Sequence, residues 1–448
     1  MKPEIFKAYD IRGIYPTEIN AEDSKNIAMA YATWLKPKKI ALGRDVRLSG
    51  PELWTAAAEG LTEMGVDVID IGVITTDMLY FAVANYGFDG GITLSASHNA
   101  SDYNGMKLVR EMSRPISIDS GITEIRDLAM SGKFEPSERK GGITKLDVRS
   151  DYIAKMLKFV DKDSIKPLAV VVNSNFGAAN LNAELIADEL GIKLTKLNFV
   201  QDGSFPKGKP DPMQAALRQE TAELVASSNV DFGVIWDADA DRCFFYDETG
   251  DFILPYYITG IIMNYFLRKN PGETVVIDPR LTWLPLEIAK KYGSKVAINK
   301  SGHSFIKERM RQENAIFGAE TSAHYYFRDL WYTDNGMVPF LIMLTMVSES
   351  DKPLSEMIKE YKGKYFAIEE VNFHVDNVPD TIEKVKKHYE NGEMSYIDGV
   401  NIDFPDWHMS LRGSNTEPVI RLNIEAKSQA LAEEKLVELT EAIGGTKA

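Results

Sequence analysis

Three aspartates alternate along one short segment, WDADADRC, which could hold a cation. Asp237, Asp239 and Asp241 follow the apolar, strand-like run FGVIW. Side chains two residues apart in extended backbone point to the same face, so we expect the three carboxylates to converge. Carboxylates this close strongly disfavour joint ionisation unless a cation lies between them. Ligation by oxygen alone favours Mg²⁺, with Mn²⁺ and Ca²⁺ as alternatives.

Two other interpretations of the acidic segment fit its surroundings less well. In an EF-hand loop counted from Asp237, Glu248 would fall at the last position, but Arg242 stands where the sharp turn requires glycine. The flanking runs FGVIW and CFFYDETGDFI predict a strand and a hairpin, whereas an EF-hand needs helices. A solvated acidic turn would not explain why the triad lies between two apolar strands.

A second polar segment, TLSASHNASDYNGMK, extends from Thr93 to Lys107. It follows the strand-like GGI and ends in an Asn104–Gly105 turn. Serine, asparagine, aspartate and glycine are ordinary turn formers. Taken alone, the segment is therefore better explained as a structural loop, and His98 as a residue with a structural hydrogen-bond partner.

These two segments and a late RGSNTEP loop together resemble the α-D-phosphohexomutase family, which comprises phosphomannomutases, phosphoglucomutases and phosphoglucosamine mutases. The similar motifs occur in the same order from FKAYDIRG near residue 6 to RGSNTEPVIRLNIEA near residue 426, which is nearly the whole chain. Within the family, GAETSAHYYFRDLWYTDNGM and KSGHSFIKERM look most similar to bacterial phosphomannomutases of the GDP-mannose pathway.

The resemblance implies an isomerase whose Ser97 carries a phosphoryl group next to Mg²⁺. The metal would neutralise charge while the phosphoryl group moves. Arg242 would contact phosphoserine or substrate, or instead only pair with the acidic triad. Ala100 stands where many relatives carry proline, which implies a less rigid serine loop. The implied catalytic residues are Ser97, His98, Lys107, Arg12 and Arg242, and the implied metal ligands are Ser97, Asp237, Asp239 and Asp241.

The resemblance also implies two substrate-binding segments in the second half of the chain. GAETSAH would bind sugar hydroxyls, and RGSNTEP with a later arginine would hold a phosphate that is not cleaved. The implied substrate-binding residues are Tyr9, Arg280, His303, Glu320, Ser322, His324, Arg412, Ser414, Asn415, Thr416 and Arg421.

The activity implied is the reversible interconversion of mannose 6-phosphate and mannose 1-phosphate through a hexose 1,6-bisphosphate, which would also act as activator. Phosphoglucomutase or dual specificity is the alternative within the family. A metal-dependent sugar-phosphate phosphohydrolase and a non-catalytic binding module are the alternatives from other classes.

Composition restricts the partners and the compartment. Of 448 residues, 44% are hydrophobic and 26% charged, as in ordinary globular proteins, and the net charge of −15 disfavours a nucleic-acid or anionic-membrane binder. A single cysteine, Cys243, excludes a disulfide within the chain. The most apolar run, PFLIMLTMV, is too short to span a bilayer. We expect a cytoplasmic monomer or weak homodimer that binds small hexose phosphates.

The elements that must position these residues recur as three βαβ patterns, at 38–72, 166–198 and 272–302, each with a glycine after its helix. The last part of the chain instead predicts a smaller α+β unit. The sequence therefore predicts an α/β fold of three related domains with mixed, partly parallel sheets, and a C-terminal α+β domain, around a central cleft. The expected domains are 1–148 with the serine loop, 149–252 with the metal loop, 253–364 with the sugar loop and 365–448 with the phosphate loop.

Overall fold

The computed structural model describes residues 1–413 and 419–447, so Ser414, Asn415 and Thr416 of the expected phosphate loop lie outside the described residues. The chain divides into two compact units. The first unit comprises Met1–Phe252 and Asp329–Asp351, and the second comprises Ile253–Arg328 and Lys352–Ala448.

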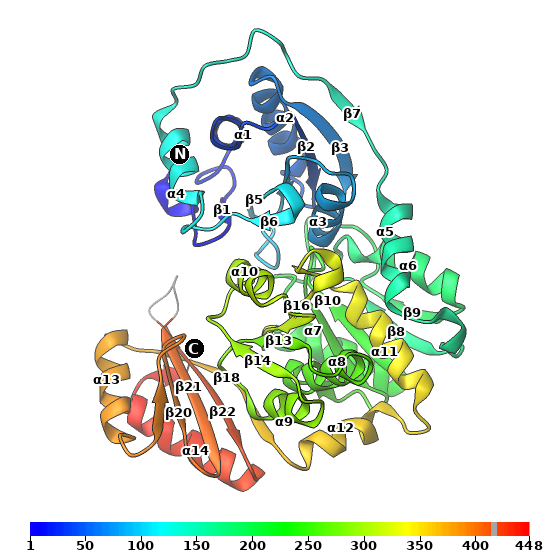
Figure 1. Ribbon diagram of the computed structural model, residues 1–448, viewed down its shortest axis with the longest axis vertical. Helices are drawn as coiled ribbons and strands as arrows, with labels where there is room; N and C mark the ends of the chain where they lie inside the picture. The colour runs from blue at the N-terminus through cyan, green and yellow to red at the C-terminus, as the bar shows by residue number, and fades with distance from the viewer. Residues whose placement is uncertain (414–418, 448) are drawn as a thin grey trace. The chain divides into compact units, whose positions relative to one another are not determined.

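The first sheet of the first unit carries the serine loop at the carboxyl ends of its parallel strands. Its strand order is β1-β5-β4-β2-β3-β7, with β6 paired to β5. Strands β2, β3 and β4 are parallel, whereas β5 is antiparallel to both β1 and β4. Helices α1 and α2 pack against each other (Figure 1). The elements are β1 (Ile11–Ile14), α1 (Ala21–Leu35), β2 (Lys39–Arg44), α2 (Gly50–Glu63), β3 (Asp67–Val73), α3 (Thr76–Asn85), β4 (Gly90–Leu94), β5 (Tyr103–Arg110), β6 (Arg114–Pro115), α4 (Ile122–Ser131) and β7 (Ile143–Lys145).

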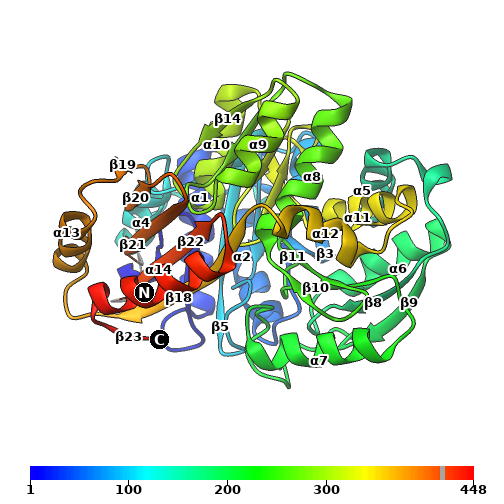
Figure 2. The same cartoon turned by 90° about the horizontal axis from the view of Figure 1, so that it is seen from below.

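The second sheet of this unit carries the acidic segment. Its order is β12-β11-β10-β8-β9, in which β10, β8 and β9 are parallel and β11 is antiparallel to β10. Figure 2 shows α6 and α7 on opposite faces of the sheet. The elements are α5 (Arg149–Met156), β8 (Ala169–Asn173), α6 (Ala179–Leu190), β9 (Lys193–Leu197), α7 (Ala215–Ser227), β10 (Phe232–Trp236), β11 (Cys243–Asp247) and β12 (Phe252–Ile253).

A later segment returns to the first unit. It contains β17 (Thr333–Asp334) and α11 (Met337–Glu349), and α11 includes the run PFLIMLTMV. The ring of Phe340 lies 5.5 Å from that of Trp236, at the end of β10. This apolar run is therefore a buried core helix, and no helix in the described part of the chain is long and apolar enough to cross a membrane.

The second unit contains the third sheet, where β14, β13 and β15 are parallel and β16 is antiparallel to β15. Its order from β14 is β14-β13-β15-β16. The elements are α8 (Pro255–Lys269), β13 (Thr274–Ile277), α9 (Trp283–Lys291), β14 (Lys295–Ile298), α10 (His303–Glu313), β15 (Phe317–Ala319), β16 (Tyr325–Phe327) and α12 (Leu354–Lys362).

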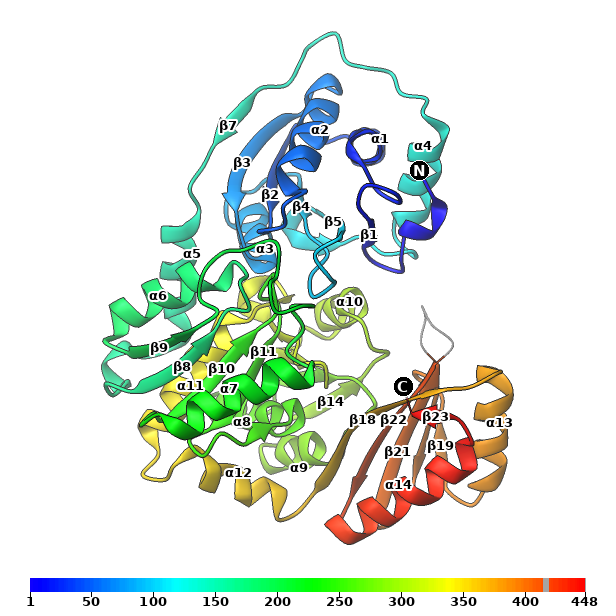
Figure 3. The same cartoon turned by 180° about the vertical axis from the view of Figure 1, so that it is seen from behind.

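The C-terminal sheet of the second unit is antiparallel, in the order β19-β20-β21-β22-β18-β23. Helix α14 lies along its strands, and α13 contacts β21 (Figure 3). Apolar residues such as Met409 and Leu411 face this helical layer, so alternation turns His408 and Arg412 to the other face. The elements are β18 (Phe366–His374), α13 (Val378–His388), β19 (Glu393–Ser395), β20 (Val400–Asp403), β21 (Trp407–Gly413), β22 (Val419–Ala426), α14 (Gln429–Ile443) and β23 (Thr446–Lys447).

The predicted fold class is confirmed: three α/β domains with mixed sheets precede a smaller α+β domain. Each predicted βαβ pattern forms a pair of parallel strands joined by a helix. Gly65, Gly191 and Gly293, which follow these helices, have φ values of 82°, 67° and 63°. They therefore adopt the left-handed conformation that the sequence predicted for helix ends.

Candidate functional site

The serine loop connects β4 to β5 at the edge where the parallel strands of the first sheet end. Ser97 is only 3% exposed, and its φ of 50° is unusual for a residue with a side chain. Its amide donates to Ser95 Oγ at 2.9 Å. Its own Oγ lies 3.1 Å from His98 Nδ1 and 3.2 Å from Asp237 Oδ2. The structure therefore places the serine loop beside the acidic segment of the second sheet.

The acidic triad converges as the alternating pattern predicted. Asp237, Asp239 and Asp241 are buried, and each offers a carboxylate oxygen within 4.8 Å of the others. Burial raises the pKa of Asp237 to about 7, although Arg242 acts in the opposite direction. Asp239 Oδ1 is buried and has no hydrogen-bond partner among the described residues. Buried oxygens of this kind fit a hard divalent cation such as Mg²⁺.

Two glycines allow close packing around the metal loop. A Cβ atom on Gly177 would lie 2.3 Å from the carbonyl oxygen of Ala238, and one on Gly336 would lie 2.3 Å from that of Ala240. The carbonyl of Gly336 accepts a hydrogen bond from Trp236 Nε1 at 2.8 Å. The loop is thus held by the turn after β8 on one side and by the segment before α11 on the other.

Three basic residues of the first unit, Lys107, Arg242 and Arg12, contact the triad or the serine loop. Lys107 Nζ lies 2.7 Å from Asp239 Oδ2 and 2.5 Å from Asp241 Oδ2. Burial acts to lower the pKa of Lys107, but the two carboxylates outweigh it and raise the pKa well above its usual value. Arg242 Nε donates to Asp237 Oδ2 at 2.8 Å, so the ion pair with the triad, one of the two expected roles of Arg242, is present.

Arg12 approaches the serine loop from β1. It pairs with Asp10 at 2.5 Å and donates to Asn99 Oδ1 at 2.9 Å. Half-buried Tyr9 lies close enough to act on the pKa of Arg12. Burial and the nearby charges of Arg242 and Arg12 lower the pKa of His98 well below its usual value. His98 is therefore a neutral imidazole whose Nδ1 faces the Ser97 hydroxyl.

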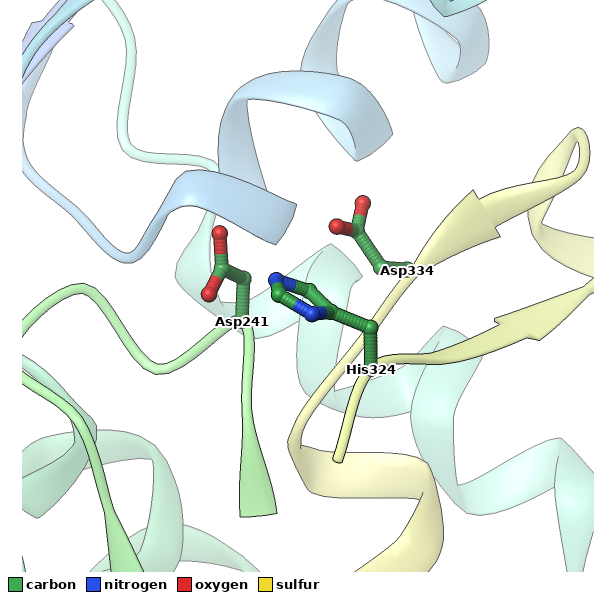
Figure 4. A group of neighbouring side chains, drawn as sticks. All are labelled: Asp241, His324 and Asp334. Atoms are coloured by element: carbon green, nitrogen blue, oxygen red, sulfur yellow. The ribbon is translucent and has the colours of Figure 1, made fainter. Parts of the chain in front are cut away.

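Another carboxylate lies next to the triad but was not predicted. Asp334, on β17, is fully buried, and one of its oxygens is within 4.8 Å of an oxygen of Asp241 (Figure 4). His324, drawn in the same figure, belongs to the second unit. Nothing in YTDNGM distinguishes Asp334 from a turn residue, and only the return of this segment to the first unit brings it to the acidic loop.

In the second unit, Glu320 is the centre of the expected sugar loop. It accepts hydrogen bonds from the amide of Gly302 at 2.7 Å and the hydroxyl of Tyr326 at 2.5 Å. Ser322 Oγ lies 3.1 Å from His324 Nδ1, and His324 Nδ1 lies 3.9 Å from Glu320. These three residues, each expected in this loop, are therefore brought together between β15 and β16.

Arg280 connects the sugar loop with the C-terminal sheet. Its Nη2 lies 2.6 Å from Asp278 and 3.8 Å from Glu320, and its Nη1 lies 3.6 Å from Glu370 on β18. Glu370 also pairs with Arg412 at 3.3 Å and with Arg421 at 3.4 Å. Three arginines expected to bind substrate therefore meet at one carboxylate.

His303 directly follows Gly302, whose amide donates to Glu320. It is the first residue of α10, and its Nδ1 is 3.4 Å from the buried Nζ of Lys307 one turn later. Besides Asp334, two residues of these sites were not predicted from the sequence: Glu370 in the second unit, and Arg47 in the first unit, whose guanidinium contacts the serine loop. Arg47 follows β2, which is parallel to β4, so the rule that parallel strands end at one edge could have indicated it.

Comparison with family models identifies all four parts of the chain. The models describe phosphoglucomutase/phosphomannomutase alpha/beta/alpha domain I at residues 3–135, domain II at 150–250 and domain III at 255–365. The C-terminal domain of the same family matches residues 370–442.

Individual proteins give the same result. A protein of Xanthomonas campestris described as "Phosphohexose mutases" is 42% identical over 443 residues, which covers 98% of this chain and 99% of that protein. A phosphomannomutase of Escherichia coli is 42% identical over 431 residues, 94% of each chain. A phosphoglucomutase/phosphomannomutase family protein of Burkholderia thailandensis has a similar crystal structure, with a TM-score of 0.88, 28% identity and coverage of 100% and 99% of the two chains.

Proposed function

Since the chain belongs to the phosphoglucomutase/phosphomannomutase family, we propose that it interconverts mannose 6-phosphate and mannose 1-phosphate. The chain is an isomerase of the phosphotransferase type, as its family and its phosphomannomutase relatives indicate. We propose mannose phosphates as the preferred substrates because relatives that are 42% identical over nearly the full length are named phosphomannomutase. Dual use of glucose phosphates is the second candidate, because the family includes both activities.

The observation that carries the proposal is the 3.2 Å distance between Ser97 Oγ and Asp237 Oδ2. This contact places a nucleophilic hydroxyl beside a buried triad of carboxylates, and such a triad suits a divalent cation. Asp237, Asp239, Asp241 and the phosphoryl oxygen of phosphorylated Ser97 would hold Mg²⁺. When bound, the metal supplies a positive charge that stabilises the moving phosphoryl group.

The residues around Ser97 would keep the phosphoryl group in place and direct the acceptor. Lys107 is an ammonium group with a raised pKa, so it donates hydrogen bonds and balances charge instead of acting as a base. Arg12, held by Asp10, offers a second cation on the same side of the loop. His98, neutral and 3.1 Å from Ser97 Oγ, orients the serine hydroxyl between transfers.

The proposed reaction has two transfers. The Oγ–P bond of phosphorylated Ser97 breaks as a free hydroxyl of the hexose monophosphate takes the phosphoryl group. The proton that this hydroxyl loses ends on Ser97 Oγ, and a hexose 1,6-bisphosphate is produced. After this bisphosphate has turned around, its other phosphate returns to Ser97. A trace of bisphosphate would therefore serve as activator, because it restores the phosphorylated enzyme.

The second unit would bind the parts of the substrate that do not react. Glu320 can accept two hydrogen bonds from neighbouring sugar hydroxyls, and Ser322 and His324 lie beside it. Arg412 and Arg421 offer planar donor groups that match a phosphate. In the second unit we assign substrate binding to Glu320, Ser322, His324, Arg412, Arg421 and Arg280, with His303 as a further candidate. Tyr9 is a further candidate in the first unit.

We further propose four domains at 1–148, 149–252, 253–364 and 365–448. The ranges of the four family models support this division. The segment 329–351 nevertheless packs with the first unit, although it belongs to the third domain by its order in the chain.

A coupled assay tests the function. Purified protein with Mg²⁺ and a trace of hexose 1,6-bisphosphate is given mannose 1-phosphate or glucose 1-phosphate, and the 6-phosphate formed is measured together with free phosphate. The proposal expects mannose 6-phosphate to form at least as fast as glucose 6-phosphate, without net phosphate release. Net phosphate release would instead indicate a phosphohydrolase.

A further inference from the structure

Arg47 makes an unusual set of hydrogen bonds to the backbone of the serine loop. Its side chain is fully buried behind the loop. Nη2 donates to the carbonyl oxygens of Ser97 at 2.7 Å and Asn99 at 2.6 Å. Nη1 donates to those of Ala100 at 2.5 Å and Tyr103 at 2.9 Å. One guanidinium group therefore binds four carbonyls from the nucleophile to the first residue of β5.

The fifth donor of the guanidinium is also used. Nε lies 3.2 Å from Asp45 Oδ2, and the amide of Arg47 donates to Asp45 Oδ1 at 2.9 Å. Since a guanidinium has five N–H donors, all of them have acceptors. Burial lowers the pKa of Arg47, and Asp45 opposes this shift. Lysine could not replace this arrangement, because an ammonium has three donors and no planar fork.

Arg47 contacts the serine loop at Ser97, the residue whose backbone conformation is unfavourable. Ser97 has a φ of 50°, a conformation that costs free energy for a residue with a side chain and persists only when its surroundings impose it. Arg47 binds the carbonyl of Ser97 while Ser95 Oγ binds its amide, so both polar groups of this peptide backbone are fixed. Position 100 is alanine, which restricts the backbone less than proline would, and its carbonyl is one of the four that Arg47 binds.

Arg47 also connects the serine loop to the second sheet of the first unit. The backbone of Arg47 forms an isolated parallel β-bridge with Gly203. The two backbones approach closely there, since a Cβ atom on Gly203 would lie 2.1 Å from the carbonyl oxygen of Val46. The ring centre of Phe205 is 5.1 Å from the guanidinium carbon. The guanidinium is therefore clamped between the serine loop and the 198–205 segment that follows β9, which limits its own movement.

We propose that Arg47 is a positioning residue for phosphoryl transfer, which holds Ser97 in the one backbone conformation that directs its Oγ at the acidic triad. This inference rests on the proposed mutase function. A phosphoryl group on a loosened loop would meet the sugar hydroxyl in poor geometry, and displacements of about 1 Å cost roughly a hundredfold in rate. Water needs no such alignment with a bound sugar, so hydrolysis of phosphoserine would slow less than transfer.

The test compares Arg47→Lys with the wild type and with Arg149→Lys. Arg149 is a suitable control because its guanidinium also binds a backbone carbonyl, that of Val73 at 3.2 Å, but none in the serine loop. Each full-length protein with Mg²⁺ is phosphorylated with hexose 1,6-bisphosphate, and the phosphorylated fraction is determined from the intact mass. A single turnover then measures, per phosphorylated chain, the rate of transfer to mannose 6-phosphate and the rate of phosphate release to water.

The expected result for Arg47→Lys is a fall in transfer of about a hundredfold and a rise of at least tenfold in the ratio of hydrolysis to transfer. Arg149→Lys should change both quantities less than threefold. The ratio is independent of how much protein is folded, since both rates refer to phosphorylated chains. Transfer within threefold of the wild type at an unchanged ratio would overturn the role of Arg47.

A second variant covers the case in which Arg47→Lys does not fold. Asp45→Asn keeps the guanidinium and removes only the charge of its partner, and it should raise the hydrolysis-to-transfer ratio at least threefold; an unchanged ratio would overturn the inference. The wild-type measurement separates the two proposals. Wild-type protein that passes its phosphoryl group only to water refutes the mutase function, whereas normal transfer in both wild type and Arg47→Lys refutes only the positioning role.

Discussion

Lys107 and Asp239 form a buried ion pair, with Nζ 2.7 Å from Oδ2. The same Nζ atom contacts Asp241, so one lysine on β5 of the first sheet binds two carboxylates that follow β10 of the second sheet. This pairing joins the serine loop, which precedes β5, to the acidic triad. It also means that the triad's charge is partly balanced by the protein itself.

Replacing Lys107 with methionine should separate its electrostatic effect on the cation from its effect on turnover. Removal of a positive charge a few ångströms from the ligands lowers repulsion of a divalent ion, so we expect Mn²⁺ affinity at pH 8 to rise about tenfold or more. Turnover should fall at least a hundredfold because the charge beside the reacting phosphate is lost. Calorimetric Mn²⁺ titration and the coupled assay measure the two effects; weaker Mn²⁺ binding would contradict this assignment.

The pKa of Asp237 predicts how metal binding depends on pH. Because burial raises this pKa to about 7, protons compete with the cation below pH 7. The apparent Mn²⁺ affinity should therefore rise as the pH increases from 5.5 to about 7 and level off above it. Asp237→Asn should bind Mn²⁺ at least tenfold more weakly. As a matched control, Asp77→Asn alters another buried carboxylate with a pKa of about 7 that lies outside the triad, and it should leave the pH dependence in place.

The acidic triad could be predicted because its three members are close in sequence and obey the alternation of extended backbone. The βαβ units were predictable for the same reason, since each depends on periodicity within about 35 residues. Arg47 could not be predicted in this way, because 50 residues separate it from Ser97 and only the order of parallel strands brings them together. The packing of α11 beside Trp236 likewise depends on a chain return that no local pattern encodes.

Glu370 partly neutralises the arginines expected to bind phosphate, so its removal should strengthen anion binding. Burial acts to raise the pKa of Glu370, but Arg280, Arg412 and Arg421 outweigh it, and the carboxylate stays ionised. For Glu370→Gln we expect the inhibition constant of inorganic phosphate to fall about fivefold at low ionic strength, and less at high salt. Glu273→Gln, which affects an ion pair with Arg328, serves as control. Weaker inhibition would show that orientation of the arginines matters more than their charge.

His408 should make the stability of the second unit depend on pH. Its Nδ1 lies 2.9 Å from Asp403 Oδ1. Burial acts to lower its pKa, but Asp403 and the charge of Glu425 outweigh burial and raise it. The charged form therefore stabilises the fold fully below pH 6.5, the unfolded value, and this stabilisation is lost as the pH rises through the raised folded value.

The comparison of wild type with His408→Gln isolates this contribution. We expect the difference in unfolding free energy between the two proteins to shrink by about 1.5 kcal/mol between pH 6 and pH 9, the usual net value of a hydrogen bond to a charged group. His388→Gln changes an exposed histidine of α13 and should show no such trend. Urea unfolding at several pH values provides the measurement, and a difference that grows with pH would contradict the assignment.

The central claim is that Ser97 carries the phosphoryl group that passes to the sugar. Full-length protein is incubated with Mg²⁺ and hexose 1,6-bisphosphate, the modified residue is located by peptide mass spectrometry, and mannose 6-phosphate is then added. The prediction is one phosphoryl group on Ser97, which leaves when the sugar is added as hexose 1,6-bisphosphate appears. Ser97→Ala should lose the label and all turnover, whereas Ser101→Ala, exposed on the same loop, should keep both. A label on another residue, or full turnover by Ser97→Ala, would contradict the claim.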